Sequence, residues 1–170
     1  MPPAARGGGT SSPPPLRILC LHGHRQTSAI FRDRIGRLAS QLSKAGIAEL
    51  SFVDGPVELP IAPGDSAALR AWWTNDEEAA SEALAAIDAH WRSGRFDGVL
   101  GFSQGAILAA AVSARPARFP GCRFAILASA PCEPSPDATA WGPLPVTLPI
   151  AIPSLHMLSM ADTAVPKSES

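Results

Sequence analysis

Short apolar runs alternate along the chain with longer stretches in which apolar residues recur every three or four positions. The short runs have the length of buried strands, and the longer stretches have the spacing of helices that bury one face. Strands are predicted at residues 16–21, 49–53, 96–100, 122–129 and 153–160, and helices at residues 28–44, 76–92 and 106–114. Strands and helices in this order predict an α/β fold, with a mostly parallel sheet and helices on both faces.

One junction between a predicted strand and a predicted helix has a sequence typical of a reactive serine. Gly101-Phe102-Ser103-Gln104-Gly105 fits the pattern G-x-S-x-G, in which a sharp turn from strand to helix pushes the serine oxygen outward. A Cβ on either glycine is expected to collide with the strand or the helix, which gives Gly101 and Gly105 a steric reason to be there. The first free N–H groups of the helix, beginning with Gln104, are expected to face negative charge that forms near Ser103.

The pattern by itself is weakly specific, because it arises by chance in about one chain in twenty of this length. The alternative is an ordinary glycine-rich turn between a strand and a helix. The predicted strand before the pattern and the predicted helix after it favour the reactive serine.

A serine hydroxyl needs a base to take its proton and an acid to orient that base. In this arrangement the partners follow the serine in the order acid, then histidine. Asp162 follows the last predicted strand and is the expected acid, with a turn or cap aspartate as the alternative. Only His156 lies after the serine, and it precedes Asp162 within an apolar strand, while His90 on a predicted helix is interpreted as structural. We therefore expect the catalytic histidine to be absent, with substitution by His22 or His24 as the alternative.

Further candidates lie in the loops. Residues 22–24 follow the first strand, at the edge where open α/β sheets bind ligands, and their backbone N–H groups are expected to face the oxyanion. Trp72 and Trp73 are adjacent and point in different directions, so either one of them lines a cleft or both cover the edge of the core. Trp141 lies in the proline-rich stretch 131–149, which is interpreted as a flap over a site or as a passive surface loop. The three tryptophans are the candidate substrate-binding residues.

Several of these segments occur together in one known family. They are residues 17–24, 70–73, 96–106 and 153–166, in the family's order and within residues 16–168. With them the chain resembles the α/β-hydrolase family of small serine hydrolases that includes the ovarian cancer-associated gene 2 esterase and its fungal relatives. The resemblance implies that Ser103 is the nucleophile and Asp162 the acid of the triad. It also implies that the backbone N–H groups of His24 and Gln104 form the oxyanion hole.

The activity implied by the resemblance is hydrolysis of carboxylic esters through an acyl-enzyme, with long-chain alkyl esters preferred by the animal esterase. The family continues past the aspartate through a helix and a strand to the catalytic histidine, whereas only residues 163–170 follow Asp162 here. We therefore expect a truncated α/β-hydrolase domain, residues 16–170, that lacks the last strand and helix and is weakly active or inactive. Residues 1–15 are expected to form a disordered leader. The alternative is a catalytically silent binding or regulatory protein that uses the pocket around Ser103.

The amino-acid composition limits the kinds of partner and cofactor that the sequence predicts. A chain of 170 residues, 46% of them hydrophobic and 17% charged, fits one domain with a sizeable core. The net charge of −1 gives no electrostatic case for nucleic acid or an anionic membrane, and no apolar run reaches the roughly 18 residues of a membrane span. Cys20, Cys122 and Cys132 are odd in number and have no metal-like spacing. We predict no metal, no cofactor and no structural disulfide, a small-molecule ester as partner, and a location in the cytoplasm with the nucleus as a second site.

Overall fold

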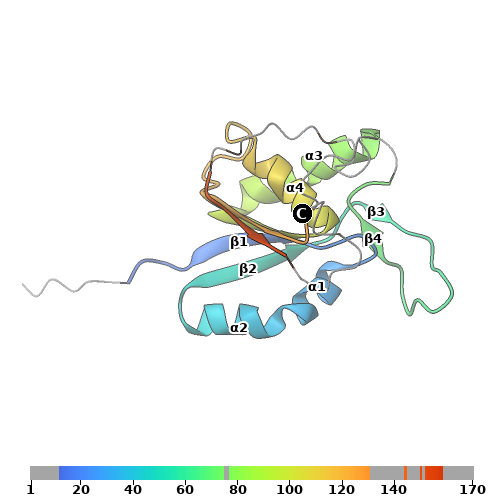
Figure 1. Ribbon diagram of the computed structural model, residues 1–170, viewed down its shortest axis with the longest axis horizontal. Coiled ribbons are helices and arrows are strands. Elements are labelled where there is room, and N and C mark those ends of the chain that lie inside the picture. The colour runs from blue at the N-terminus through green and yellow to red at the C-terminus, as the bar shows by residue number, and fades with distance from the viewer. Residues whose placement is uncertain (1–11, 75–76, 131–143, 145–149, 151, 159–170) are drawn as a thin grey trace, which may run out of the picture.

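A five-stranded sheet lies at the centre of the protein (Figure 1). The computed structural model describes residues 12–74, 77–130, 144, 150 and 152–158. All neighbouring strands of the sheet run parallel, in the order β2-β1-β5-β6-β7. The strands are β1 Leu16–Leu21, β2 Ala48–Val53, β5 Gly98–Phe102, β6 Phe124–Ala128 and β7 Ser154–Met157. The α/β fold predicted from the sequence is confirmed, and the strand that leads to Ser103 is the central one.

Helices cover both faces of this sheet (Figure 1). The helices α1 Ser28–Arg34 and α2 Gly36–Lys44 lie on one face, and α3 Glu77–Gly94 and α4 Gln104–Ser113 lie on the other. Each face has its own hydrophobic cluster, because successive side chains of a strand point to opposite sides of the sheet. No helix within the described ranges is both long and apolar enough to cross a membrane.

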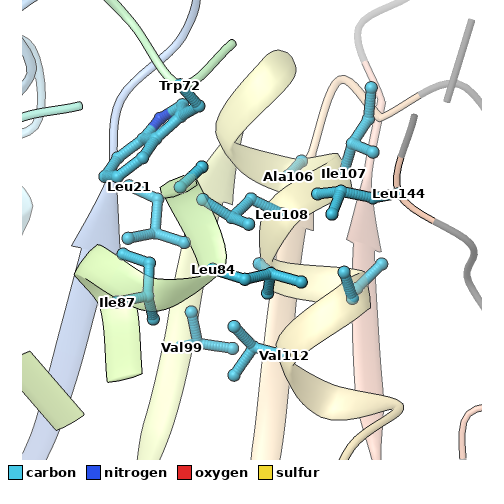
Figure 2. Packing of buried hydrophobic residues seen from close by; sticks show 14 of the residues in the cluster. Leu21, Trp72, Leu84, Ile87, Val99, Ala106, Ile107, Leu108, Val112 and Leu144 are labelled. Carbon is cyan, nitrogen blue, oxygen red and sulfur yellow. The ribbon is translucent and has the colours of Figure 1, made fainter. Parts of the chain in front are cut away.

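The helix that follows Ser103 is buried along nearly its whole length. Every residue of α4 from Gly105 to Ser113 is buried, which confirms the prediction of a buried helix. Figure 2 shows side chains of α3 and α4 on the same face of the sheet, where Val112 of α4 and Leu84 of α3 approach Val99 of β5. The start of α4 is therefore held by packing on several sides, and the position of Ser103 depends on that packing.

The helix predicted over residues 28–44 is in fact two helices. Ile35 has φ −108° and ψ 14°, and it separates α1 from α2. The spacing hides this break, because Phe31, Ile35 and Leu42 still pack on one cluster. Leu38, which shares that spacing, is 44% exposed, since α2 leaves it outside the contact with the sheet.

Residues 56–74, which lie outside the strands and helices predicted from the sequence, contain a small antiparallel pair of strands. The strands are β3 Val57–Glu58 and β4 Arg70–Ala71. An isolated bridge from Gln26 to Arg70 joins this pair to the loop after β1. Strands of two residues are too short to show an alternating pattern, which is why the sequence gives no sign of them.

Candidate active site

Ser103 is the single residue between the central strand β5 and the buried helix α4. Its backbone angles are φ 51° and ψ −117°. A positive φ is uncommon for a residue that carries a Cβ, so the turn holds Ser103 in a strained conformation. The sequence predicted this strand–turn–helix arrangement, although β5 reaches two residues further than expected and α4 begins two residues earlier. The side chain is half-buried at the carboxyl end of the sheet.

The two glycines of the turn are needed for steric reasons. A Cβ on Gly101 would overlap the carbonyl oxygen of Gly105, and a Cβ on Gly105 would overlap the carbonyl oxygen of Leu21. These obstacles are backbone atoms, which cannot move aside as a flexible side chain can. The collision with strand and helix expected from the sequence is therefore present at both positions.

Backbone N–H groups near Ser103 differ in whether they already have acceptors. The Ser103 N–H donates to Ala128 O at 2.9 Å, so it continues the pairing of β5 with β6. The N–H groups of Gln104 and His24 find no acceptor within the described part of the chain. Gln104 follows β5 and His24 follows β1, and these strands are neighbours with Leu21 opposite Gly101. Both N–H groups thus lie at the same edge of the sheet, although their role at an oxyanion stays a prediction.

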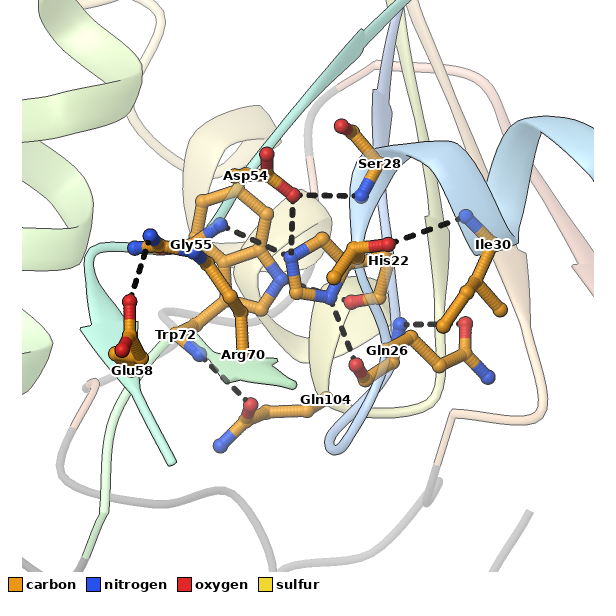
Figure 3. A network of polar contacts seen from close by, with 12 residues as sticks. His22, Gln26, Ser28, Ile30, Asp54, Gly55, Glu58, Arg70, Trp72 and Gln104 are labelled. Atoms are coloured by element: carbon orange, nitrogen blue, oxygen red, sulfur yellow. Dashed lines mark hydrogen bonds and ion pairs between the residues drawn. The ribbon is translucent and has the colours of Figure 1, made fainter. Parts of the chain in front are cut away.

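His22 is fully buried and makes hydrogen bonds through both ring nitrogens (Figure 3). Nδ1 lies 2.8 Å from Gly23 O, and Nε2 lies 2.9 Å from the N–H of Gly55. A carbonyl oxygen only accepts and an amide N–H only donates, so the ring is neutral with its proton on Nδ1. Burial lowers the pKa of His22, opposed by its contact with Gly23 O and by the carboxylate of Asp54. Neither nitrogen is free to take a proton from Ser103.

The two adjacent tryptophans are both buried. Trp72 is 0% exposed and Trp73 is 6% exposed. These values agree with the interpretation that both side chains cover the edge of the core. The ring of Trp72 stacks on His22 with a centroid distance of 5.1 Å, and its indole N–H donates to His22 O at 2.8 Å. Contact of either indole with a substrate stays a prediction.

The Gln104 side chain makes contacts that the sequence gave no means to foresee. Its Oε1 accepts from the N–H of Trp72 at 2.9 Å, and its Nε2 donates to Trp73 O at 2.8 Å. The partners lie more than thirty positions away along the chain. Residue spacing predicts contacts within one element, and these contacts join a helix start to a loop.

None of the remaining predicted side chains makes a hydrogen bond to Ser103 within the described part of the chain. Asp162 and Trp141 lie outside the described residues, as do Cys132 and residues 1–11. His156 is exposed on β7, two strands from β5, and its Nε2 lies 3.3 Å from Ser154 Oγ. His24 is exposed in the loop after β1, and partial burial and the charge of Arg25 lower its pKa.

The two cysteines that the structure describes, Cys20 and Cys122, show no sign of a second reactive centre. Burial raises the pKa of Cys20 to about 12 and that of Cys122 to about 11, so neither thiol ionises near neutral pH. Both are free thiols. Among the residues that the structure describes, no group of three or more His, Cys, Asp or Glu side chains is placed to hold a metal ion.

The sequence matches known hydrolases over most of its length. A family model described as serine hydrolase (FSH1) matches residues 11–170. The chain belongs to the FSH1 serine hydrolase family. It is 36% identical over 187 residues to esterase OVCA2 of Homo sapiens, covering 92% of this chain and 80% of that protein. It is 40% identical over 111 residues to esterase FPY3 of Fusarium mangiferae, covering 59% of this chain and 49% of that protein.

A solved thioesterase also aligns with this FSH1-family chain. RedJ, from the prodiginine biosynthetic pathway of Streptomyces coelicolor, is 19% identical with a TM-score of 0.42. The alignment covers 74% of this chain and 45% of RedJ. The family resemblance drawn from the sequence is confirmed by the family model and by the named esterases, and the chain is a serine hydrolase by family.

The buried neutral state of His22 predicts a pH dependence of stability. Its pKa is lowered in the folded protein, so below about pH 6.5 the unfolded chain binds a proton that the folded chain does not. The free energy of unfolding should therefore fall as the pH is lowered from about 7 to about 5, by at most about 1.4 kcal/mol per pH unit from this one group. Urea unfolding at a series of pH values measures it.

The matched variants are His22→Gln, which no longer titrates, and His90→Gln, which removes an exposed histidine of α3. The slope of unfolding free energy against pH should flatten in His22→Gln, and His90→Gln shows how much of any change comes from replacing a histidine as such. His24→Gln is measured beside them, because the pKa of His24 is lowered as well. An unchanged slope in His22→Gln would show that the buried ring is not the group that couples pH to folding.

Proposed function

We propose that this chain is a serine carboxylesterase in which Ser103 is the nucleophile. The observation that carries the proposal is the backbone of Ser103, held at φ 51° between β5 and α4 with the Gln104 N–H left without an acceptor among the described residues. This geometry exposes a hydroxyl at a helix start, where N–H groups stabilise negative charge. Membership of the serine hydrolase family and the esterase names of its relatives support the same chemistry.

The proposed reaction has two halves. Ser103 Oγ attacks the ester carbonyl while its proton passes to a base, and the carbonyl oxygen becomes an oxyanion that the N–H groups of His24 and Gln104 stabilise. The intermediate collapses, the C–O bond of the alcohol breaks, and the alcohol leaves with a proton. Water then attacks the acyl-enzyme in the same way and releases the carboxylic acid. Asp162 is the proposed acid that orients the base, by resemblance alone.

We also propose that none of the four histidines of the chain acts as this base. His22 is buried with both nitrogens engaged, and no histidine among the described residues makes a hydrogen bond to Ser103. A triad without one member keeps roughly 10³–10⁴-fold acceleration over water in well-studied hydrolases. The 170-residue chain should therefore hydrolyse esters slowly, with long-chain alkyl esters as the proposed substrates.

A panel of p-nitrophenyl esters, from acetyl to palmitoyl, tests the proposed activity. We expect p-nitrophenol release above that of Ser103→Ala, and a further increase when imidazole is added, because imidazole supplies a base. The matching p-nitroanilides should not react. Release that is equal in the chain and in Ser103→Ala, with both shown to be folded by circular dichroism, would contradict the esterase. Binding of a non-hydrolysable ether analogue by that folded chain would then support the catalytically silent alternative.

A further inference from the structure

The Gln104 side chain connects the turn of Ser103 to a distant segment of the chain. Its amide forms two hydrogen bonds with backbone groups of consecutive residues, accepting from the Trp72 N–H and donating to Trp73 O. An amide can make both bonds at once, because its oxygen accepts and its nitrogen donates. Residues 72 and 73 follow β4 directly, so the amide holds this segment against the start of α4. Figure 3 shows the bond between Gln104 and Trp72.

Trp72 continues this connection to the loop after β1. Its indole N–H donates to His22 O at 2.8 Å, and its ring stacks on the His22 imidazole. His22 lies two residues before His24, whose N–H is one of the two proposed oxyanion donors. The other proposed donor is the backbone N–H of Gln104 itself. A path of direct contacts therefore runs from one donor to the other, and its first link is the Gln104 amide.

The loop after β1 has other supports, so it should remain folded without this link. The Gln26 side chain accepts from the Gly23 N–H at 3.3 Å, and the Arg70 N–H donates to Gln26 O at 3.0 Å. His22 Nε2 accepts from Gly55 as well. These contacts anchor the loop to β4 and to the turn after β2, whereas the Gln104 amide alone ties this assembly to α4 by side-chain hydrogen bonds among the described residues.

We propose that the Gln104 side chain is a positioning residue, which holds the Trp72–Trp73 segment and, through it, the loop of residues 22–25 in register with the start of α4. The catalytic part of this inference rests on the proposed function. Every substitution of Gln104 keeps the backbone N–H, so its effects report on the side chain. A displacement of about 1 Å in a catalytic group costs up to about a hundredfold in rate. Loss of the amide should slow reactions of Ser103 by about ten- to a hundredfold.

The first test is hydrogen exchange in the whole chain, which needs no catalysis. Gln104→Met keeps the length of the side chain and removes both hydrogen bonds, and Gln41→Met makes the same change at an exposed position of α2. We expect faster exchange of the Trp72 amide and of residues 22–25 in Gln104→Met alone, with β1 and β5 unchanged. Equal exchange in the two variants would overturn the proposal, and so would faster exchange across the whole sheet, which would indicate general destabilisation.

The second test is the rate at which a fluorophosphonate labels Ser103. Gln104→Met should slow labelling by about ten- to a hundredfold relative to wild type. Gln104→Glu has a carboxyl that, once protonated, donates and accepts like the amide. Its labelling rate, as a ratio to wild type at each pH, should therefore recover as the pH falls. A ratio that does not change with pH would count against the positioning role. Wild-type chain that does not label contradicts the proposed function, while the exchange comparison still decides whether Gln104 positions the loop.

Discussion

Fluorophosphonate labelling of the 170-residue chain is expected to be slow and to vanish completely in Ser103→Ala. On the proposed mechanism, the oxygen of Ser103 attacks the phosphorus of the probe, and the N–H groups at the start of α4 stabilise the negative charge that forms. Removing the oxygen removes the reaction, whatever base assists it. The measurement is in-gel fluorescence against time, with added imidazole used to raise the wild-type rate.

Ser129 provides the matched control for this experiment. It also has φ 51°, and it follows β6 as Ser103 follows β5. Ser129→Ala should label at the wild-type rate, because Ser129 does not lie at the start of a buried helix. Labelling that persists in Ser103→Ala would place the reactive oxygen elsewhere. A folded wild-type chain that the probe never labels, even with imidazole, would favour the catalytically silent binding protein over the esterase.

Replacing Gly105 with alanine is expected to destabilise the fold by about 3 kcal/mol or more, at or above the upper end of the usual range for overpacking. The added Cβ would overlap the carbonyl oxygen of Leu21 and lie 2.5 Å from that of His22. Relief requires α4 to move away from β1, and α4 is buried along this contact. Urea unfolding of Gly105→Ala beside the wild type measures the loss, with soluble expression as a first indication.

Gly36→Ala is the control, because a Cβ at Gly36 meets nothing within 4 Å. Gly36 is the first residue of α2, where alanine is up to about 1 kcal/mol more favourable than glycine. The two substitutions add the same methyl group and should have opposite signs. A Gly105→Ala chain as stable as the wild type would show that the contact between α4 and β1 is looser than its geometry implies.

Strands and helices whose residues show a local hydrophobic pattern were predictable from the sequence. Contacts between segments that are distant in the sequence were not. The apolar runs located every strand of the main sheet, and the pattern G-x-S-x-G located the junction of β5 with α4. Histidine at position 22 reads as an ordinary loop residue, and nothing local marks it as buried. Its surroundings come from Gly55 and Trp72, 33 and 50 residues away in the chain.

The same reason explains what was missed at Gln104. The sequence assigned a role to its backbone N–H because that role follows from the start of a helix. The role of its side chain depends on the position of Trp72 and Trp73, which follow β4. A strand of two residues such as β4 is too short to produce an alternating pattern in the sequence. The break at Ile35 was hidden for a related reason, since Phe31 of α1 and Leu42 of α2 pack on the same hydrophobic cluster.

The positive φ of Ser103 sets stability against reactivity at one position. Strain of this kind costs of the order of 1–3 kcal/mol, and glycine would adopt the same angles without it. Selection for stability alone would therefore favour glycine at this position, and glycine has no oxygen for the proposed reaction. In a lineage that stopped using the hydroxyl, a mutation to glycine would strengthen the fold. The substitution that relieves the strain of this backbone is therefore also one that removes the hydroxyl.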